Sequence, residues 1–146
     1  MQIEQTPTTA LRVMERMLHE GFGEGRLEVV DELCSPDLIE HQFGLSGEGA
    51  AAIAKVKQGI TQVHTGLPDL QFSIEDWAEH DDVIWVRAEG AGTNTGPFFG
   101  PPTGLSVRFT VIDIARIEGG RIAEHWGVPD RFAIMMRLGL LTPPSQ

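Results

Sequence analysis

Near the end of the chain, acidic and imidazole side chains gather in the run VIDIARIEGGRIAEHWGVPD, residues 111–130. Asp113 lies in an apolar, strand-like segment between Ile112 and Ile114, so both faces of that segment look covered. Burying a carboxylate without a partner is costly. A buried acid is therefore either part of a structural network or a general base in an apolar cavity, and the sequence leaves both interpretations open.

A histidine follows across the predicted turn at Gly119–Gly120. Strand alternation places His125 on the face of Ala123 and Gly127, while Glu124 and Trp126 point the other way. Taken alone, His125 is typical of a sheet histidine bonded to glutamate or backbone. Because it shares a hairpin with Asp113, we expect Asp113 to be the base and His125 to polarise the substrate or relay a proton.

Other residues are candidates for holding a substrate. His41 follows a short extended piece, where a histidine is more often a surface or core residue, and we expect it to orient the substrate at the cavity mouth. Asp130 follows Pro129 and is expected to cap the last helix, with ligand contact as a second role at the cavity rim. We expect the wall or lid of the cavity to be formed by Trp85, Phe98, Phe99 and Trp126.

Several familiar catalytic motifs are missing from the sequence. The five histidines show neither H-x-x-x-H nor H-E-x-x-H spacing, and Cys34 is the only cysteine, so we expect no metal site. There is no G-x-S-x-G and no Walker loop, and GEGAAAIA lacks the dinucleotide fingerprint. The sequence therefore contains none of these nucleotide-binding or nucleophile motifs.

Hydrophobic periodicity predicts the elements that would position these residues. Apolar residues at helical spacing indicate three helices, within 5–22, 26–34 and 46–66, with a short extended piece at 38–43. A period of two then predicts strands over 70–80, 83–93, 105–117 and 120–128, before a last helix within 131–141. Helices followed by antiparallel strands indicate the α+β class. Such a sheet must curl over its helices, which leaves a conical interior suited to a small molecule.

Length and charge limit the remaining possibilities. A chain of 146 residues predicts one domain, residues 1–146. A net charge of −10 argues against partners with phosphate backbones and against anionic membranes, and no segment has the about 18 apolar residues that a membrane span needs. A single cysteine and an N-terminus unlike a signal peptide predict a cytoplasmic location.

Three segments of the C-terminal half resemble a known family. GPFFGPPTG (96–104), the run from Val107 to Asp130 and MRLGLL (136–141) are similar to SnoaL-like polyketide cyclases of the nuclear transport factor 2-like superfamily. The resemblance extends over nearly the whole chain. It implies a cone of three N-terminal helices on a strongly bent antiparallel sheet, with a short C-terminal helix. It also implies ring closure by intramolecular aldol condensation, without cofactor or metal.

The resemblance also implies roles for individual positions. In the cyclases an aspartate on the last strand takes the proton and a histidine on the preceding strand assists. Here the aspartate position is Gly127 and the histidine position is Asp113. The mechanism therefore transfers if Asp113 substitutes as the base, with His125 or His41.

Three functions follow from these observations. The first is a cofactor-independent enzyme acting on a hydrophobic, carbonyl-bearing small molecule. The second is a non-catalytic binding protein on the same cone, which Gly127 favours. The third is an epoxide hydrolase-like or isomerase-like activity; activating water would require a second carboxylate near Asp113, either Glu40 or Glu89. A homo-oligomer, dimer or tetramer, is also expected because such a sheet leaves one apolar face uncovered.

Overall fold

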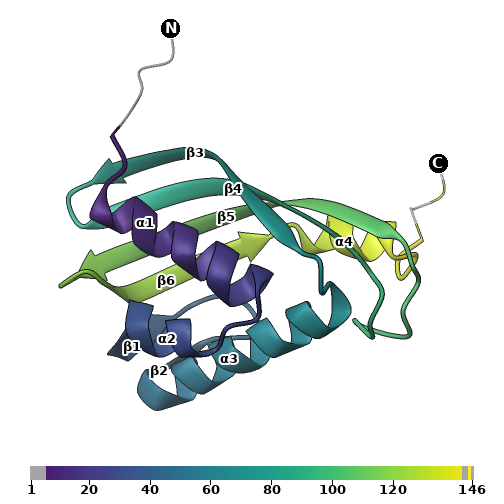
Figure 1. Cartoon of the computed structure of the whole chain (residues 1–146), viewed down its shortest axis with the longest axis horizontal. Helices are drawn as coiled ribbons and strands as arrows, with labels where there is room; N and C mark the ends of the chain where they lie inside the picture. Colours follow the sequence, from purple (N-terminus) through teal and green to yellow (C-terminus); the bar gives the residue numbers. More distant parts are fainter. Residues whose placement is uncertain (1–5, 143–144, 146) are drawn as a thin grey trace, which may run out of the picture.

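In the computed structural model, which describes residues 6–142 and residue 145, a helical N-terminal part precedes a curved sheet (Figure 1). The helices are α1 (Thr9–Arg16), which continues directly as the π-helix η1 (Met17–Gly23), then α2 (Glu28–Leu33), α3 (Gly49–Gly66) and α4 (Arg131–Arg137). The strands are β1 (Cys34–Glu40), β2 (Gly47–Glu48), β3 (Gln71–His80), β4 (Val83–Thr93), β5 (Ser106–Glu118) and β6 (Arg121–Pro129). The predicted α+β class is confirmed.

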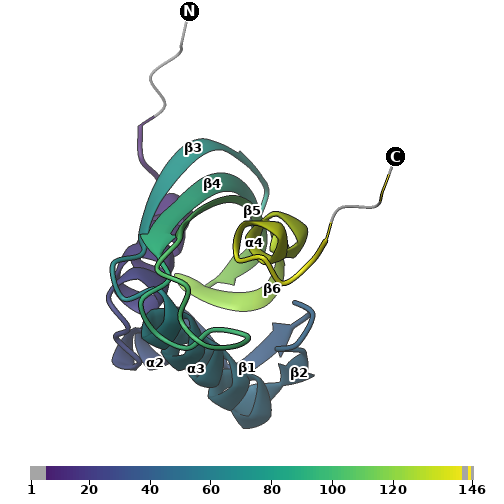
Figure 2. The ribbon, with the colours of Figure 1, turned by 90° about the vertical axis from the view of Figure 1, so that its right-hand side faces the viewer.

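The strands form one sheet in the order β2-β1-β6-β5-β4-β3. The strands β3 to β6 run antiparallel, as the period of two predicts, and curve around the space above α3 (Figure 2). The strand β1 pairs with β6 in parallel and brings Glu40 beside His125. The parallel pair was not expected from the sequence, and it adds β1 to the antiparallel strands beside the candidate active site.

The boundary between α2 and β1 lies earlier than predicted. The helix ends at Leu33, and the strand begins at Cys34 instead of residue 38. The register of β1 against β6 shifts between Cys34 and Ile39, the stretch that contains Pro36. Proline has no N–H to give to a ladder, so an irregular stretch is where a strand tolerates it.

The two faces of β5 differ in burial. Phe109, Val111 and Asp113 are buried on the inner face, as alternation predicts. On the outer face Ile112 is 38% exposed. The expectation that both faces are covered is therefore wrong for this chain, because the helices of the described part pack on the inner side (Figure 1).

A loop of residues 94–105 joins β4 to β5, as its glycines and prolines predict. Asn94 is fully buried and organises this loop from inside. Its amide nitrogen donates to the carbonyl oxygens of Gly66 and Gly96, and its amide oxygen accepts from Thr103. A Cβ on Gly66 would lie 2.4 Å from the Cβ of Phe98, so only glycine lets the loop dock so closely on the end of α3. The loop thereby holds Phe98 over the sheet interior.

Within the described residues, no helix has the length and apolar character needed to cross a membrane.

Candidate active site

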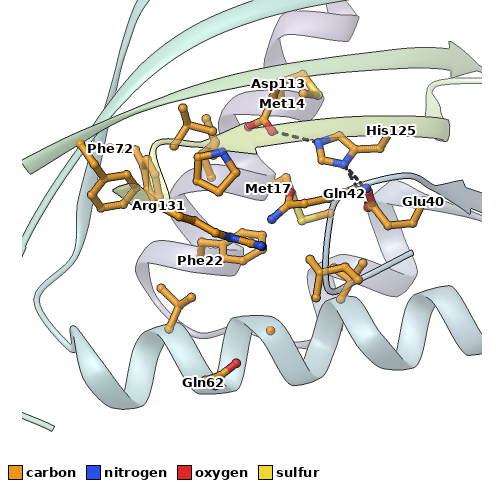
Figure 3. A pocket seen from close by; sticks show the side chains of 18 of the residues that line it. Met14, Met17, Phe22, Glu40, Gln42, Gln62, Phe72, Asp113, His125 and Arg131 are labelled. Atoms are coloured by element: carbon orange, nitrogen blue, oxygen red, sulfur yellow. Dashed lines mark hydrogen bonds and ion pairs between the residues drawn. The ribbon is translucent and has the colours of Figure 1, made fainter. Parts of the chain in front are cut away.

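The concave side of the sheet encloses a cavity of about 160 Å³ (Figure 3). An apolar cavity of about 150 Å³ can hold a benzene-sized molecule. The walls come from α1, η1, α3, the inner face of the sheet and α4, and are mostly aliphatic and aromatic. The polar side chains among the lining residues are Glu40, Gln42, Gln62, Asp113, His125 and Arg131.

Three of these polar residues form a hydrogen-bonded row. Nε2 of His125 lies 3.0 Å from Oδ1 of Asp113, and Nδ1 lies 2.9 and 3.0 Å from the two carboxylate oxygens of Glu40. Glu40 is 4% exposed and Asp113 5% exposed. Figure 3 shows the imidazole between the two acids. The site is therefore a carboxylate–imidazole–carboxylate row at the wall of an apolar cavity.

Electrostatics decide the charge on the central ring. Burial by itself lowers the pKa of His125, but the hydrogen bonds to Asp113 and Glu40 and their negative charges outweigh burial and raise the pKa to about 10. At neutral pH His125 is therefore an imidazolium that donates one N–H to each acid. In that state neither ring nitrogen is free to accept a proton. The Oδ2 atom of Asp113 makes no hydrogen bond to the described residues.

Strand register places the three residues together. Asp113 and His125 come from adjacent strands, β5 and β6, with inward-facing side chains as predicted. Glu40 is brought to His125 by the parallel pairing of β1 with β6. The sequence predicts Glu40 only as a second acid for a hydrolase, and its contact with His125 is not predicted. Alternation along β1 indicates that Glu40 is on the buried face, but it does not indicate the pairing with β6 that makes the contact.

Gly127 has a direct structural relation to Asp113. The two residues are register partners across β5 and β6. Where the family resemblance implies an acid on β6, this chain therefore has its acid, Asp113, on the neighbouring strand β5 at the same level of the sheet. The space beside Gly127 is filled by Gln42: a Cβ at position 127 would lie 2.0 Å from Oε1 of Gln42 and 2.9 Å from Cε1 of His125.

The structure places His41 elsewhere than expected. Its side chain is 40% exposed, and Nε2 lies 2.7 Å from Oε2 of Glu124. The ring stacks on Trp126 with 4.7 Å between centroids. His41 does not line the cavity. The structure therefore does not bring His41 to the cavity wall, because neighbouring side chains of an extended segment point to opposite faces and it is Glu40 that points inward.

The remaining candidates divide into two groups. Phe98 and Phe99 line the cavity, with Phe98 buried and Phe99 52% exposed. Trp85 and Trp126 do not line it, because both lie on the outer face of the sheet in register with Ile114. Asp130 does not line it either: its Oδ1 accepts from the backbone N–H of Ala133 at 2.9 Å, so it is the N-cap of α4.

Cys34 also lines the cavity but is not a nucleophile. Burial, together with the negative charges of Glu40 and Asp31, raises the pKa of this thiol to about 12. A thiol with such a pKa stays protonated at neutral pH. In the part of the chain that the structure describes, no group of three or more His, Cys, Asp or Glu residues is arranged to hold a metal ion.

A curved α+β sheet wrapped around a cavity of this kind defines the nuclear transport factor 2-like class of cone-shaped proteins. Within that class the chain belongs to the SnoaL-like polyketide cyclase family, whose model matches residues 12–138. The resemblance found in the sequence is thereby confirmed. A comparison with curated proteins found no match.

Solved structures of similar proteins support the same fold. TsrD from Streptomyces laurentii is 25% identical with a TM-score of 0.79, over 94% of this chain and 100% of that chain. IdmH from Streptomyces antibioticus, a proposed polyketide cyclase, is 26% identical with a TM-score of 0.73, over 91% and 99% of the two chains. AclR from Streptomyces galilaeus, a proposed hydroxylase, is 24% identical with a TM-score of 0.76, over 95% and 91%, and supports the fold alone.

Proposed function

We propose that the protein is a cofactor-independent acid/base enzyme that removes a proton next to a carbonyl group of a small hydrophobic molecule. The observation that carries this proposal is Asp113, a buried carboxylate at the wall of an apolar cavity, hydrogen-bonded to a charged His125. Ring closure by intramolecular aldol condensation is the reaction that the family suggests.

The proposed reaction begins at Asp113. Its carboxylate takes a proton from the carbon next to the carbonyl and becomes a carboxylic acid, while the substrate becomes an enolate. The enolate carbon then attacks a second carbonyl of the same molecule, one carbon–carbon bond forms, and the resulting alkoxide takes the proton back from Asp113. The proton is returned, so no co-reactant is consumed. A positioned base of this kind contributes about 10²–10⁴-fold to the rate.

In this proposal His125 and Glu40 prepare the base. The imidazolium fixes one oxygen of Asp113 through Nε2, and Glu40 fixes the ring from the other side through Nδ1. This refines the expectation that His125 relays a proton, because both of its N–H groups are occupied. A carboxylate is a weak base, so the substrate must carry an acidified C–H, flanked by a second carbonyl or an aromatic ring.

The other expected functions fit the same geometry less closely. A water-activating hydrolase would need two acids on one water, but Glu40 lies on the far side of the His125 ring from Asp113 and Glu89 pairs with Arg108. An isomerase would use the same first step. A binding protein would need no ionised pair facing the cavity, yet Asp113 and His125 both line it.

A proton-exchange assay tests the proposal without knowledge of the natural substrate. Deuterium uptake by 2-indanone, a small ketone with benzylic C–H groups beside its carbonyl, is followed by NMR in deuterated buffer. Wild-type protein should accelerate uptake, and Asp113→Asn should lower that rate by about 10²-fold or more while leaving the fold, measured by circular dichroism, unchanged. A matched control is Asp130→Asn, which alters an acid outside the cavity. Equal rates with and without wild-type protein would support the binding protein instead.

We further propose that the outer face of the sheet forms a homo-oligomer, a dimer or tetramer, in the cytoplasm. Ile112 and Val128 are register partners on that face and are 38% and 66% exposed. Neighbouring exposed apolar side chains are typical of an interface. Light scattering should give at least twice the mass of the chain, and a monomer would refute the assignment.

A further inference from the structure

Arg131 brings a positive charge to the wall of the cavity. It is the first residue of α4 and lines the cavity. Nη2 donates to the carbonyl oxygen of Phe43 at 2.6 Å, and the guanidinium lies 5.2 Å from the centre of the Phe43 ring. Among residues 6–142 and 145, no carboxylate lies within ion-pair distance of Arg131, although the chain is strongly acidic. Most of its N–H donors therefore have no protein partner in the described chain.

Gln42 adds a second polar group to the same wall. It directly precedes Phe43, whose carbonyl oxygen holds Arg131. Its backbone N–H donates to Glu40, but its side-chain amide makes no hydrogen bond to the described residues. The amide occupies the space beside Gly127, next to the ring of His125. Figure 3 shows both Gln42 and Arg131 pointing into the cavity.

We propose that Arg131 and Gln42 bind a carboxylate of the substrate, so that the molecule on which the enzyme acts is a small carboxylic acid that also carries a carbonyl group. This inference rests on the proposed function for the carbonyl and adds the acid. An arginine fork matches the two oxygens of a carboxylate, and its charge strengthens each hydrogen bond. The amide of Gln42 supplies a further donor.

Charges elsewhere in the cavity orient such a substrate. Two acidic side chains, Glu40 and Asp113, and only one basic one, His125, stand in the row at the cavity wall. This excess of acidic groups repels an anionic group and directs it toward Arg131. The aromatic walls, with Phe22, Phe72 and Phe98 among them, contact the hydrocarbon part. The uncharged, carbonyl-bearing end of the molecule is then left facing Asp113.

A pair of matched probes tests the charge preference by binding alone. Benzoate and benzamide have the same single ring, a size that suits a cavity of about 160 Å³, and differ in charge. Titrations at pH 7, followed by NMR or calorimetry, should show at least tenfold tighter binding of benzoate to the wild-type protein. Arg131→Gln should weaken benzoate binding by about 10- to 100-fold and leave benzamide unchanged, the usual range for hydrogen bonds to a charged group.

The matched control is Arg137→Gln, which removes an exposed positive charge from the same helix and should leave both affinities unchanged. Gln42→Leu should weaken benzoate binding by about 2- to 10-fold, as expected for one hydrogen bond. Arg131→Lys keeps the charge without the fork, so intermediate affinity is expected. This second variant tests the site if Arg131→Gln fails to fold.

Results that would overturn the inference are equal affinities for the two probes, no binding of benzoate to the wild-type protein, or an equal loss in Arg131→Gln and Arg137→Gln. Its failure can be told apart from failure of the proposed function. Asp113→Asn should keep the preference for benzoate while losing the exchange of 2-indanone. Exchange without benzoate preference refutes only the carboxylate, and benzoate preference without exchange refutes only the base.

Discussion

Two histidine–carboxylate pairs join β1 to β6, one on each face of the sheet. On the inner face, Glu40 at the end of β1 bonds His125 of β6; on the outer face, His41, the residue that follows β1, bonds Glu124 of β6. The residue types are the same and come from neighbouring positions, with the partners exchanged. The inner imidazole side chain is 16% exposed and the outer one 40%. The pair that the chain could use for chemistry is therefore selected by the face it occupies, because residue type alone does not distinguish the two.

The partners of each pair reinforce this difference. The inner imidazole contacts a second buried acid, Asp113, and its pKa rises to about 10. On the outer face, the hydrogen bond from His41 is the main cause that lowers the pKa of Glu124; burial opposes the shift and Arg116 adds to it. Solvent screens charges on that face, so the outer pair contributes little to stability. The stability that the inner row contributes therefore depends on whether His125 is protonated.

Removing each histidine in turn should show the largest contrast. His125→Gln leaves Glu40 and Asp113 buried without their charged partner and should lower the free energy of unfolding by about 3–5 kcal/mol. His41→Gln removes an exposed pair and should cost less than about 1 kcal/mol. Urea unfolding at pH 7, followed by circular dichroism, measures both. Equal losses of unfolding free energy in the two variants would mean that burial does not make the inner pair more stabilising than the outer pair.

The inner pair should also give stability a characteristic pH dependence. His125 has a pKa of about 10 in the folded protein and near 6.5 when unfolded, so the folded state binds the extra proton between these values. Its contribution is complete below about pH 6.5 and is lost as the pH rises toward 10, by a few kcal/mol in all. Urea unfolding of the wild type at several pH values should show this fall, and the His125→Gln curve should lack it. Parallel curves would show that His125 is not held as an imidazolium.

How much of this site the sequence predicts depends on the range of each contact. The hairpin of β5 and β6 is local, and alternation along two neighbouring strands correctly placed Asp113 and His125 on one inner face. Asp130 as a helix cap was likewise predictable from a residue type and its immediate neighbours. Local patterns were sufficient wherever the partners lie within one hairpin or one helical turn.

The third member of the row, Glu40, could not be predicted in this way because its contact with His125 is not local. Glu40 and His125 are 85 residues apart and meet through a parallel pairing that no local pattern indicates. The sequence pattern instead led to a prediction that His41, one position from Glu40, lies at the cavity mouth. In a strand, a shift of one residue exchanges the two faces. A prediction that is wrong by one position therefore selects the exposed His41 instead of the buried Glu40.

A smaller effect would show how tightly the inner face is packed. A Cβ at Gly127 would meet Gln42 and the ring of His125, at 2.0 and 2.9 Å, so Gly127→Ala should cost about 1–3 kcal/mol, the usual range for overpacking. The Gln42 side chain is flexible at its end, so shortening it with Gln42→Ala should recover part of the loss, while the contact with His125 persists. A double-mutant cycle by urea unfolding measures this coupling. The next residue, Val128, points outward and is exposed, so it serves as the control. Val128→Ala should couple with Gln42→Ala by less than about 0.5 kcal/mol. Similar coupling energies at positions 127 and 128 would mean that Gln42 does not fill the space beside the Cα of Gly127.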